Sequence, residues 1–119
     1  MLPSAEKKET LAYVRSGGKC PFQEWFDNLD TQTALKVETA IARIKEGNLS
    51  NVKSLGQGVS EYRLNFGPGY RIYFGIDCGR LVILLGGGTK KRQGKDIQIA
   101  KSLWKEYKSE DKKGVVRWH

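Results

Sequence analysis

The side chains best suited to bind a phosphate lie in the middle and the last third of the chain. Arg63 and Arg71 stand in two neighbouring segments of alternating polar and apolar residues, and Tyr73 follows two positions after Arg71. A planar guanidinium can donate two parallel hydrogen bonds to a phosphate, so arginines placed in this way suit an anionic ligand. A cluster of basic residues comes after the Gly86–Gly88 triplet and consists of Lys90, Lys91, Arg92 and Lys95.

The distribution of charge points to the same part of the chain. The 119 residues include 21 Lys and Arg against 13 Asp and Glu, a net charge of +8. Ten basic and four acidic residues lie from Gly86 to His119, so this segment alone carries +6. A one-sided positive field attracts a phosphate backbone or an acidic protein partner. A solvated basic face with no ligand has the same composition, so charge alone leaves these alternatives open.

Several classes of protein are disfavoured by the sequence. The longest apolar run, Leu81 to Leu85, is far shorter than the ~20 residues that a membrane-spanning helix needs. The first ten residues, MLPSAEKKET, contain no apolar core of a secretory signal. Cys20 and Cys78 form neither a CxxC pair nor a metal-binding spacing. We therefore expect a cytoplasmic chain with reduced thiols, no membrane contact, no metal and no cofactor.

The two arginines fall on a predicted β-hairpin that turns at Gly67-Pro68-Gly69. Alternation places Arg63 on one face with Glu61 and Asn65, and Arg71 on one face with Tyr73. We expect the opposite, apolar face to pack on helices, while Arg63, Arg71 and Tyr73 point to solvent or to a ligand. The unbroken apolar run from Leu81 to Leu85 predicts a central strand that is buried on both faces.

The remaining segments predict the elements around this hairpin. A first strand is expected at Glu9 to Arg15, and a strand or loop that carries Lys53 is expected at 51–55. Pro21 and Asp30 are typical of the starts of two consecutive amphipathic helices, which we expect to lie on one face of a sheet. A last helix is predicted from near Asp96, and residues 108–119 read as a basic tail. The sequence thus predicts a single α+β domain.

An ordered set of motifs resembles a known family. The motifs are Glu61-Tyr62-Arg63-Leu64, Gly67-Pro68-Gly69-Tyr70-Arg71-Ile72-Tyr73-Phe74, Leu84-Leu85-Gly86-Gly87-Gly88 and Lys90…Gln93…Asp96-Ile97. Over about residues 9–107 the chain resembles RelE/ParE-superfamily toxins of type II toxin–antitoxin systems, closest to the HigB-like "addiction module killer protein" group. The sequence departs from the family pattern at Thr89, and it has no Tyr or His between Gly88 and Ile97.

The resemblance implies a fold and a function. The fold would be a small twisted antiparallel sheet with an N-terminal helical hairpin on one face and a C-terminal helix, spanning residues 1–119 with a core at 9–107. The function would be metal-independent endoribonuclease cleavage of mRNA, typically on the ribosome. The partners would be a cognate antitoxin with a helix-turn-helix and, only through the antitoxin complex, DNA.

The chemistry of such cleavage restricts the candidate residues. The 2′-hydroxyl must lose a proton, the charge that develops on the phosphate must be stabilised, and the leaving 5′-oxygen must be protonated. Arg71 and Lys90 match the family's catalytic Arg and Lys, and Arg63 and Tyr73 share the face of Arg71. We expect these four to be catalytic, and Lys53, Lys91, Arg92 and Lys95 to bind RNA. The only histidine, His119, is not expected to take part.

Other hypotheses remain at this point. Arg71 could instead form a structural ion pair with Glu61 or Asp77. The ParE branch of the same superfamily inhibits DNA gyrase without being an enzyme, and the chain could share that activity. An inactive relative that only binds an antitoxin or RNA is the third alternative, because a residue for proton transfer is missing where RelE-type nucleases often carry one.

Overall fold

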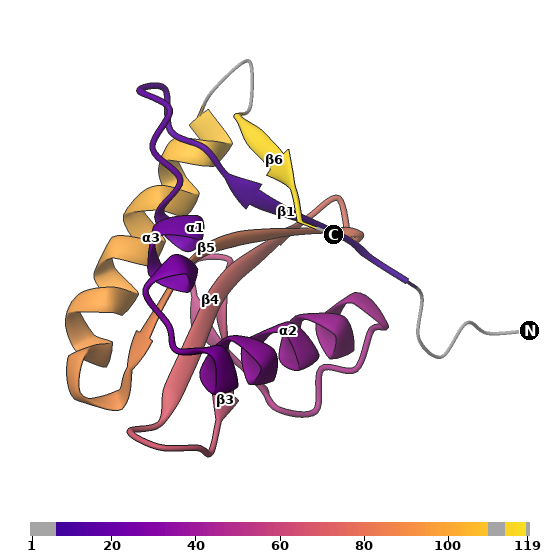
Figure 1. The fold of residues 1–119 in the computed structure, drawn as a ribbon. Coiled ribbons are helices and arrows are strands. Elements are labelled where there is room, and N and C mark those ends of the chain that lie inside the picture. The colour runs from indigo at the N-terminus through magenta and orange to yellow at the C-terminus, as the bar shows by residue number, and fades with distance from the viewer. Residues whose placement is uncertain (1–6, 110–113, 119) are drawn as a thin grey trace, which may run out of the picture.

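The structure, a computed structural model, describes residues 7–109 and 114–118, and these form one mixed sheet with helices on both faces (Figure 1). The elements in chain order are β1 (Glu9–Tyr13), α1 (Pro21–Asp27), α2 (Thr31–Lys45), β2 (Val52–Gly56), β3 (Val59–Leu64), β4 (Tyr70–Asp77), β5 (Leu81–Thr89), the short 3₁₀-helix η1 (Lys90–Arg92), α3 (Gln93–Ser109) and β6 (Val115–Arg117). The predicted α+β class is confirmed.

The sheet is not wholly antiparallel, and in this respect the prediction is wrong. Its strand order is β2-β3-β4-β5-β1-β6. Strand β1 pairs with β5 in parallel, with Leu11 opposite Ile83, whereas the other neighbouring strands are antiparallel. Helices α1 and α2 and three strands lie between β1 and β5 in the chain, and a long connection of this kind permits parallel pairing where a hairpin does not.

The predicted helical hairpin lies on one face of the sheet, as expected. Asp30 caps α2 by accepting a hydrogen bond of 2.8 Å from the backbone N–H of Thr33. Helices α1 and α2 pack on the face that presents Val82 and Leu84 of β5, and α3 packs on the face that presents Ile83 and Leu85. Strand β5 is therefore buried on both faces, and its prediction as a central strand is confirmed.

Helix α3 covers the face that we expected to be open. Tyr73 is 1% exposed and Arg71 is 7% exposed, so these two side chains do not point to solvent, whereas Arg63 is exposed. The alternative, that they point to a ligand, stays a prediction. The apolar stripe of α3 must be buried, and it packs on this face of the sheet. Trp104 lies so close to Gly75 that a Cβ there would be 2.5 Å from the indole ring. The helix also begins at Gln93 rather than near Asp96.

The predicted basic tail is partly wrong, because its end joins the sheet. Strand β6 pairs antiparallel with β1, with Val116 opposite Ala12. Trp118 is buried against α1, with its ring centroid 4.8 Å from that of Phe22 and 5.1 Å from that of Phe26. The pattern of local residues gave no sign of this contact, since its partners lie near the other end of the chain. His119 lies outside the described residues.

We predict that Trp118→Ala lowers the free energy of unfolding by about 3–5 kcal/mol, because it empties a buried aromatic site. Urea denaturation followed by circular dichroism measures this value. The exposed neighbour Val116 provides the control, and Val116→Ala should change stability by no more than about 0.5 kcal/mol. Equal effects of the two substitutions would contradict the docking of this segment.

Candidate functional site

Two rows of side chains run across the strands on the α3 face. In the first row Lys53 of β2 stands opposite Glu61 of β3, Glu61 opposite Tyr73 of β4, and Tyr73 opposite Gly86 of β5. Cross-strand partners on one face lie close enough to interact directly. Lys53 is exposed at the edge strand, whereas Glu61 and Tyr73 are buried. The sequence alone did not indicate that Lys53 and Tyr73 belong to one row.

The second row contains the two arginines, and both of them contact Glu61 of the first row. Arg63 stands opposite Arg71, and Arg71 stands opposite Gly88. Glu61 is 1% exposed and accepts a hydrogen bond of 2.6 Å from Arg63 Nε, while Arg71 Nε lies 3.6 Å from its other carboxylate oxygen. Two like charges opposite each other repel, so a carboxylate between them allows both arginines to stay.

Arg71 and Lys90 meet at the turn that begins β4. The Gly69 carbonyl accepts a hydrogen bond of 3.0 Å from Arg71 Nη1 and one of 2.9 Å from the backbone N–H of Lys90. Gly69 has φ of 79°, a conformation that favours glycine. The structure therefore brings together the two residues that the sequence placed in separate segments. Within the described residues, Arg71 Nε has no hydrogen-bond acceptor.

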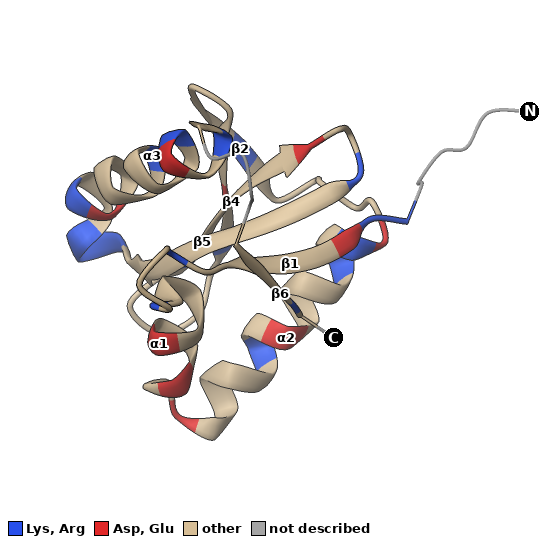
Figure 2. Cartoon of the chain, turned by 90° about the horizontal axis from the view of Figure 1, so that it is seen from above, with Lys and Arg blue, Asp and Glu red and all other residues tan. Residues whose placement is uncertain are grey.

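The predicted basic cluster borders this site. Lys90, Lys91 and Arg92 form η1, Lys95 lies in the first turn of α3, and all four side chains are exposed. Figure 2 shows Lys and Arg along α3, whereas α1 carries only acidic residues among its charged ones. The cations of this cluster are thus available to a ligand that approaches Arg71.

Two further polar groups lie under α3. Tyr73 Oη has no hydrogen-bond partner among the described residues. Burial, with the negative charges of Glu61 and Asp96, raises the pKa of Tyr73 to about 12, so its hydroxyl keeps its proton. Burial also raises the pKa of Asp96 above its ordinary value, although Arg92 and Lys95 oppose this shift.

The sequence left the partner of Arg71 open between Glu61 and Asp77, and it gave no role to Asp96. Of the two partners considered for Arg71, the structure shows Glu61; Asp77 instead accepts a hydrogen bond of 2.8 Å from Tyr107. A carboxylate two positions before Arg63, on the same strand face, was the available signal for Glu61. No local signal marked Asp96, whose carboxylate lies where a Cβ at Gly88 would collide with it.

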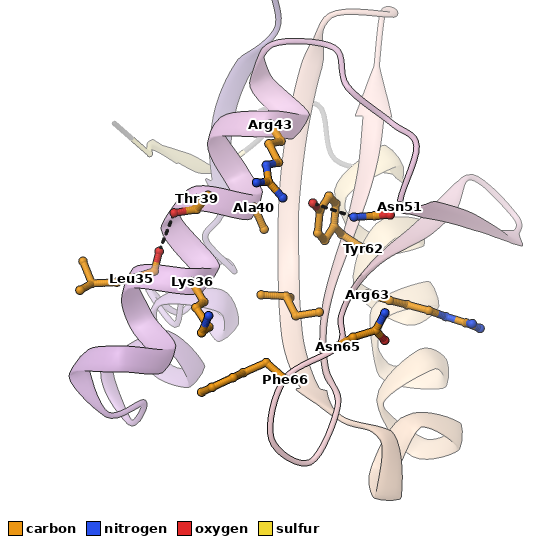
Figure 3. A pocket seen from close by; sticks show the side chains of 11 residues that line it. Leu35, Lys36, Thr39, Ala40, Arg43, Asn51, Tyr62, Arg63, Asn65 and Phe66 are labelled. Carbon is orange, nitrogen blue, oxygen red and sulfur yellow. Dashed lines mark hydrogen bonds between the residues drawn. The ribbon is translucent and has the colours of Figure 1, made fainter.

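A separate groove of about 410 Å³ lies between α2 and β3 (Figure 3). Its cations include Lys36, which lies 4.7 Å above the centre of the Phe66 ring, and Arg43. The side chain of Arg63 points away from α2. Lys36 and Arg43 belong to α2, which packs on the face of the sheet opposite to the one that carries Arg71. They therefore do not share one bound phosphate with Arg71.

The fold and site define a small α+β protein that presents fixed cations at one end of its sheet. Residues 24–105 match the family described as "Phage derived protein Gp49-like (DUF891)", and the chain belongs to this family. The family is associated with RelE-like toxins of toxin–antitoxin systems, and membership suggests an antitoxin partner.

One relative is an uncharacterized protein of Haemophilus influenzae. It is 42% identical over 86 residues, which cover 71% of this chain and 87% of the relative. No solved structure matches the chain. In residues 7–109 and 114–118, no helix is long and apolar enough to cross a membrane, and no three His, Cys, Asp or Glu side chains gather as a metal site.

We predict that Glu61→Gln lowers the free energy of unfolding by about 3–5 kcal/mol, because it leaves the Arg71 charge buried without a counter-charge. Chemical denaturation measures the loss. The double variant Glu61→Leu with Arg71→Met should recover most of it, since apolar side chains of similar size replace a buried pair at little cost.

The control for this prediction is Glu9→Gln, which removes the exposed pair of Glu9 with Arg117 at 3.7 Å. It should cost no more than about 1 kcal/mol. A loss of that small size at Glu61 as well would show that the buried pair does not hold the site together.

Proposed function

We propose that this chain is the toxin of a type II toxin–antitoxin system and a metal-independent endoribonuclease that cleaves mRNA on the ribosome. It would be a single toxin domain of the HigB-like, RelE-like type, with its core at residues 9–107. It would act in the cytoplasm and be neutralised by a cognate antitoxin with a helix-turn-helix, through which alone it would contact DNA. No resident cofactor is required by this proposal.

The observation that carries the proposal is that the Gly69 carbonyl accepts hydrogen bonds from the Arg71 guanidinium and from the backbone N–H of Lys90, so that these two residues are neighbours. Arg71 is held by Glu61 and by this carbonyl, so its guanidinium is already oriented before a ligand binds. A cation fixed in a largely buried site stabilises developing negative charge without the cost of reorienting solvent. Membership of a family associated with RelE-like toxins supports the same conclusion.

In the proposed mechanism, charge stabilisation and orientation provide most of the rate enhancement. Arg71 and Lys90 hold the scissile phosphate as the 2′-hydroxyl attacks it, and they stabilise the additional negative charge. The 2′-hydroxyl gives its proton to water, the bond from phosphorus to the 5′-oxygen breaks, the 5′-oxygen takes a proton from water, and a 2′,3′-cyclic phosphate is left. Arg63, which is exposed beside Arg71, orients the neighbouring phosphate. Four further cations bind the part of the RNA that flanks this phosphate, namely Lys53, Lys91, Arg92 and Lys95.

Tyr73 has a different role in this proposal from that of the arginines. Its pKa of about 12 makes it a weak general acid near neutral pH. Because Tyr73 is almost fully buried, it reaches RNA only where part of the substrate enters the space beneath α3. We therefore assign it to substrate contact through its hydroxyl.

The test is primer extension on cellular mRNAs after brief induction of the chain without its partner. We predict new 5′ ends within translated regions, in frame with the codons. Lys90→Ala should lower the cleavage rate by about 10²-fold or more, because it removes a cation that stabilises the transition state. This substitution is preferable to Arg71→Ala, which would leave the buried Glu61 with Arg63 alone as its counter-charge and could lower stability as well as activity.

The control is Arg80→Ala, an exposed cation in the turn between β4 and β5 at the opposite end of these strands. It should cleave as the unsubstituted chain does. Growth arrest with intact messages would contradict the nuclease and support a non-enzymatic inhibitor of DNA gyrase. Intact messages with normal growth would indicate an inactive relative.

A further inference from the structure

A small hollow lies between α1, β5 and α3, and it contains Tyr73, the residue assigned above to substrate contact. Its volume is about 170 Å³. A cavity of about 150 Å³ with apolar walls is large enough to hold benzene, whereas drug-sized ligands occupy about 300–1,000 Å³. The hollow therefore admits one planar ring system. Its lining includes Trp25, Tyr73, Leu85, Gly86, Asp96 and Ala100.

The walls of the hollow are shaped for a flat group. Trp25 lies directly against the backbone of Gly87, because a Cβ there would collide with the six-membered ring of the indole. Gly86, which stands opposite Tyr73, leaves open space where a side chain would be, with no atom within 4 Å of that position. Leu85 and Ala100 add apolar surface. A planar ligand can thus lie beside the Trp25 indole and over the backbone of Gly86.

The polar groups of the hollow are few and have free hydrogen-bonding capacity. Among the described residues that line it, Tyr73 and Asp96 carry the ionisable side chains. Tyr73 is 1% exposed and its hydroxyl has no partner within the described part of the chain, so a ligand group here would satisfy a buried donor. The Asp96 carboxylate has Arg92 at 3.8 Å, and as an ionised group it only accepts hydrogen bonds.

We infer that this hollow is a subsite for a guanine base of the RNA, positioned by Asp96, Tyr73 and Trp25. The inference rests on the proposed function, because it places the base next to the phosphate held at Arg71. Proteins read an unstacked base by hydrogen bonds to its Watson–Crick edge and by contact with aromatic side chains. Guanine presents two adjacent donors on that edge, N1–H and the 2-amino group, which match the two oxygens of one carboxylate.

The other bases fit this arrangement less well. Adenine and cytosine present an amino donor next to a ring nitrogen that is an acceptor, and this acceptor would face a carboxylate oxygen. Uracil presents one N–H between two carbonyl oxygens. Each of these bases leaves an unfavourable pairing of acceptors at Asp96, and a polar group left without a partner in a partly buried site lowers affinity. The hollow should therefore prefer guanine.

The experiment is a titration of the ¹⁵N-labelled chain with nucleoside 3′-monophosphates, followed through the indole N–H resonances. The Trp25 resonance is assigned by its loss in Trp25→Phe. We predict that guanosine 3′-monophosphate shifts this resonance and binds about tenfold more tightly than the adenosine, cytidine and uridine compounds. Inosine 3′-monophosphate, which lacks only the 2-amino group, should also bind more weakly than the guanosine compound.

Two variants make the assignment specific to Asp96. Asp96→Asn should lose the preference for guanosine, because an amide presents one donor and one acceptor. The matched control is Glu24→Gln, which removes an exposed carboxylate on α1 next to Trp25 without altering the hollow, and it should keep the preference. If Asp96→Asn does not fold, the comparison of guanosine with inosine on the unsubstituted chain still decides the question.

The outcomes separate this inference from the proposed function. Equal binding of all the nucleotides, or binding that leaves the Trp25 resonance unmoved, overturns the guanine subsite even if the chain cleaves mRNA. Selective guanosine binding that shifts Trp25 supports the subsite. If the same chain then cuts no message, the subsite stands and the nuclease proposal fails.

Discussion

The buried carboxylate of Glu61 is the constraint on which the site depends. A carboxylate at this position is stable only with counter-charges, and the chain supplies Arg63 at 2.6 Å and Arg71 at 3.6 Å. The pairing rows of β3 and β4 place these three side chains together without help from any loop. Because Arg71 also donates to the Gly69 carbonyl, the ion pair connects the interior of the sheet to the turn between β3 and β4, and the backbone N–H of Lys90, the first residue of the basic cluster, donates to the same carbonyl.

Helix α3 gives this charged arrangement its surroundings. By covering the face of the sheet, it excludes water from Tyr73 and from most of Arg71, and charges interact more strongly where water is excluded. Its first turn also brings Asp96 over Gly88, the residue of β5 that stands opposite Arg71. One element therefore completes the second half of the core, closes the site and contributes a carboxylate to its border.

The sequence was informative wherever a local pattern decided the outcome. Period-2 alternation separated the two faces of β3 and β4 correctly, and the Asp30 cap and the apolar stripes located α1 and α2. The side on which α3 packs, the parallel pairing of β1 with β5, and the docking of Trp118 could not be read locally, because each depends on residues far apart in the chain. For the same reason the sequence left the partner of Arg71 undecided.

The central claim is that Arg71, fixed by Glu61, receives a phosphate of the RNA. The most direct measurement follows the arginine Nε–H resonances of the chain while a short RNA with 2′-O-methyl groups, which cannot be cleaved, is added. The account predicts that the Arg71 signal shifts at the lowest RNA concentrations, while that of Arg15, which is paired with Glu106 at 3.0 Å, stays in place. An unmoved Arg71 signal under conditions in which the RNA is fully bound would contradict the account.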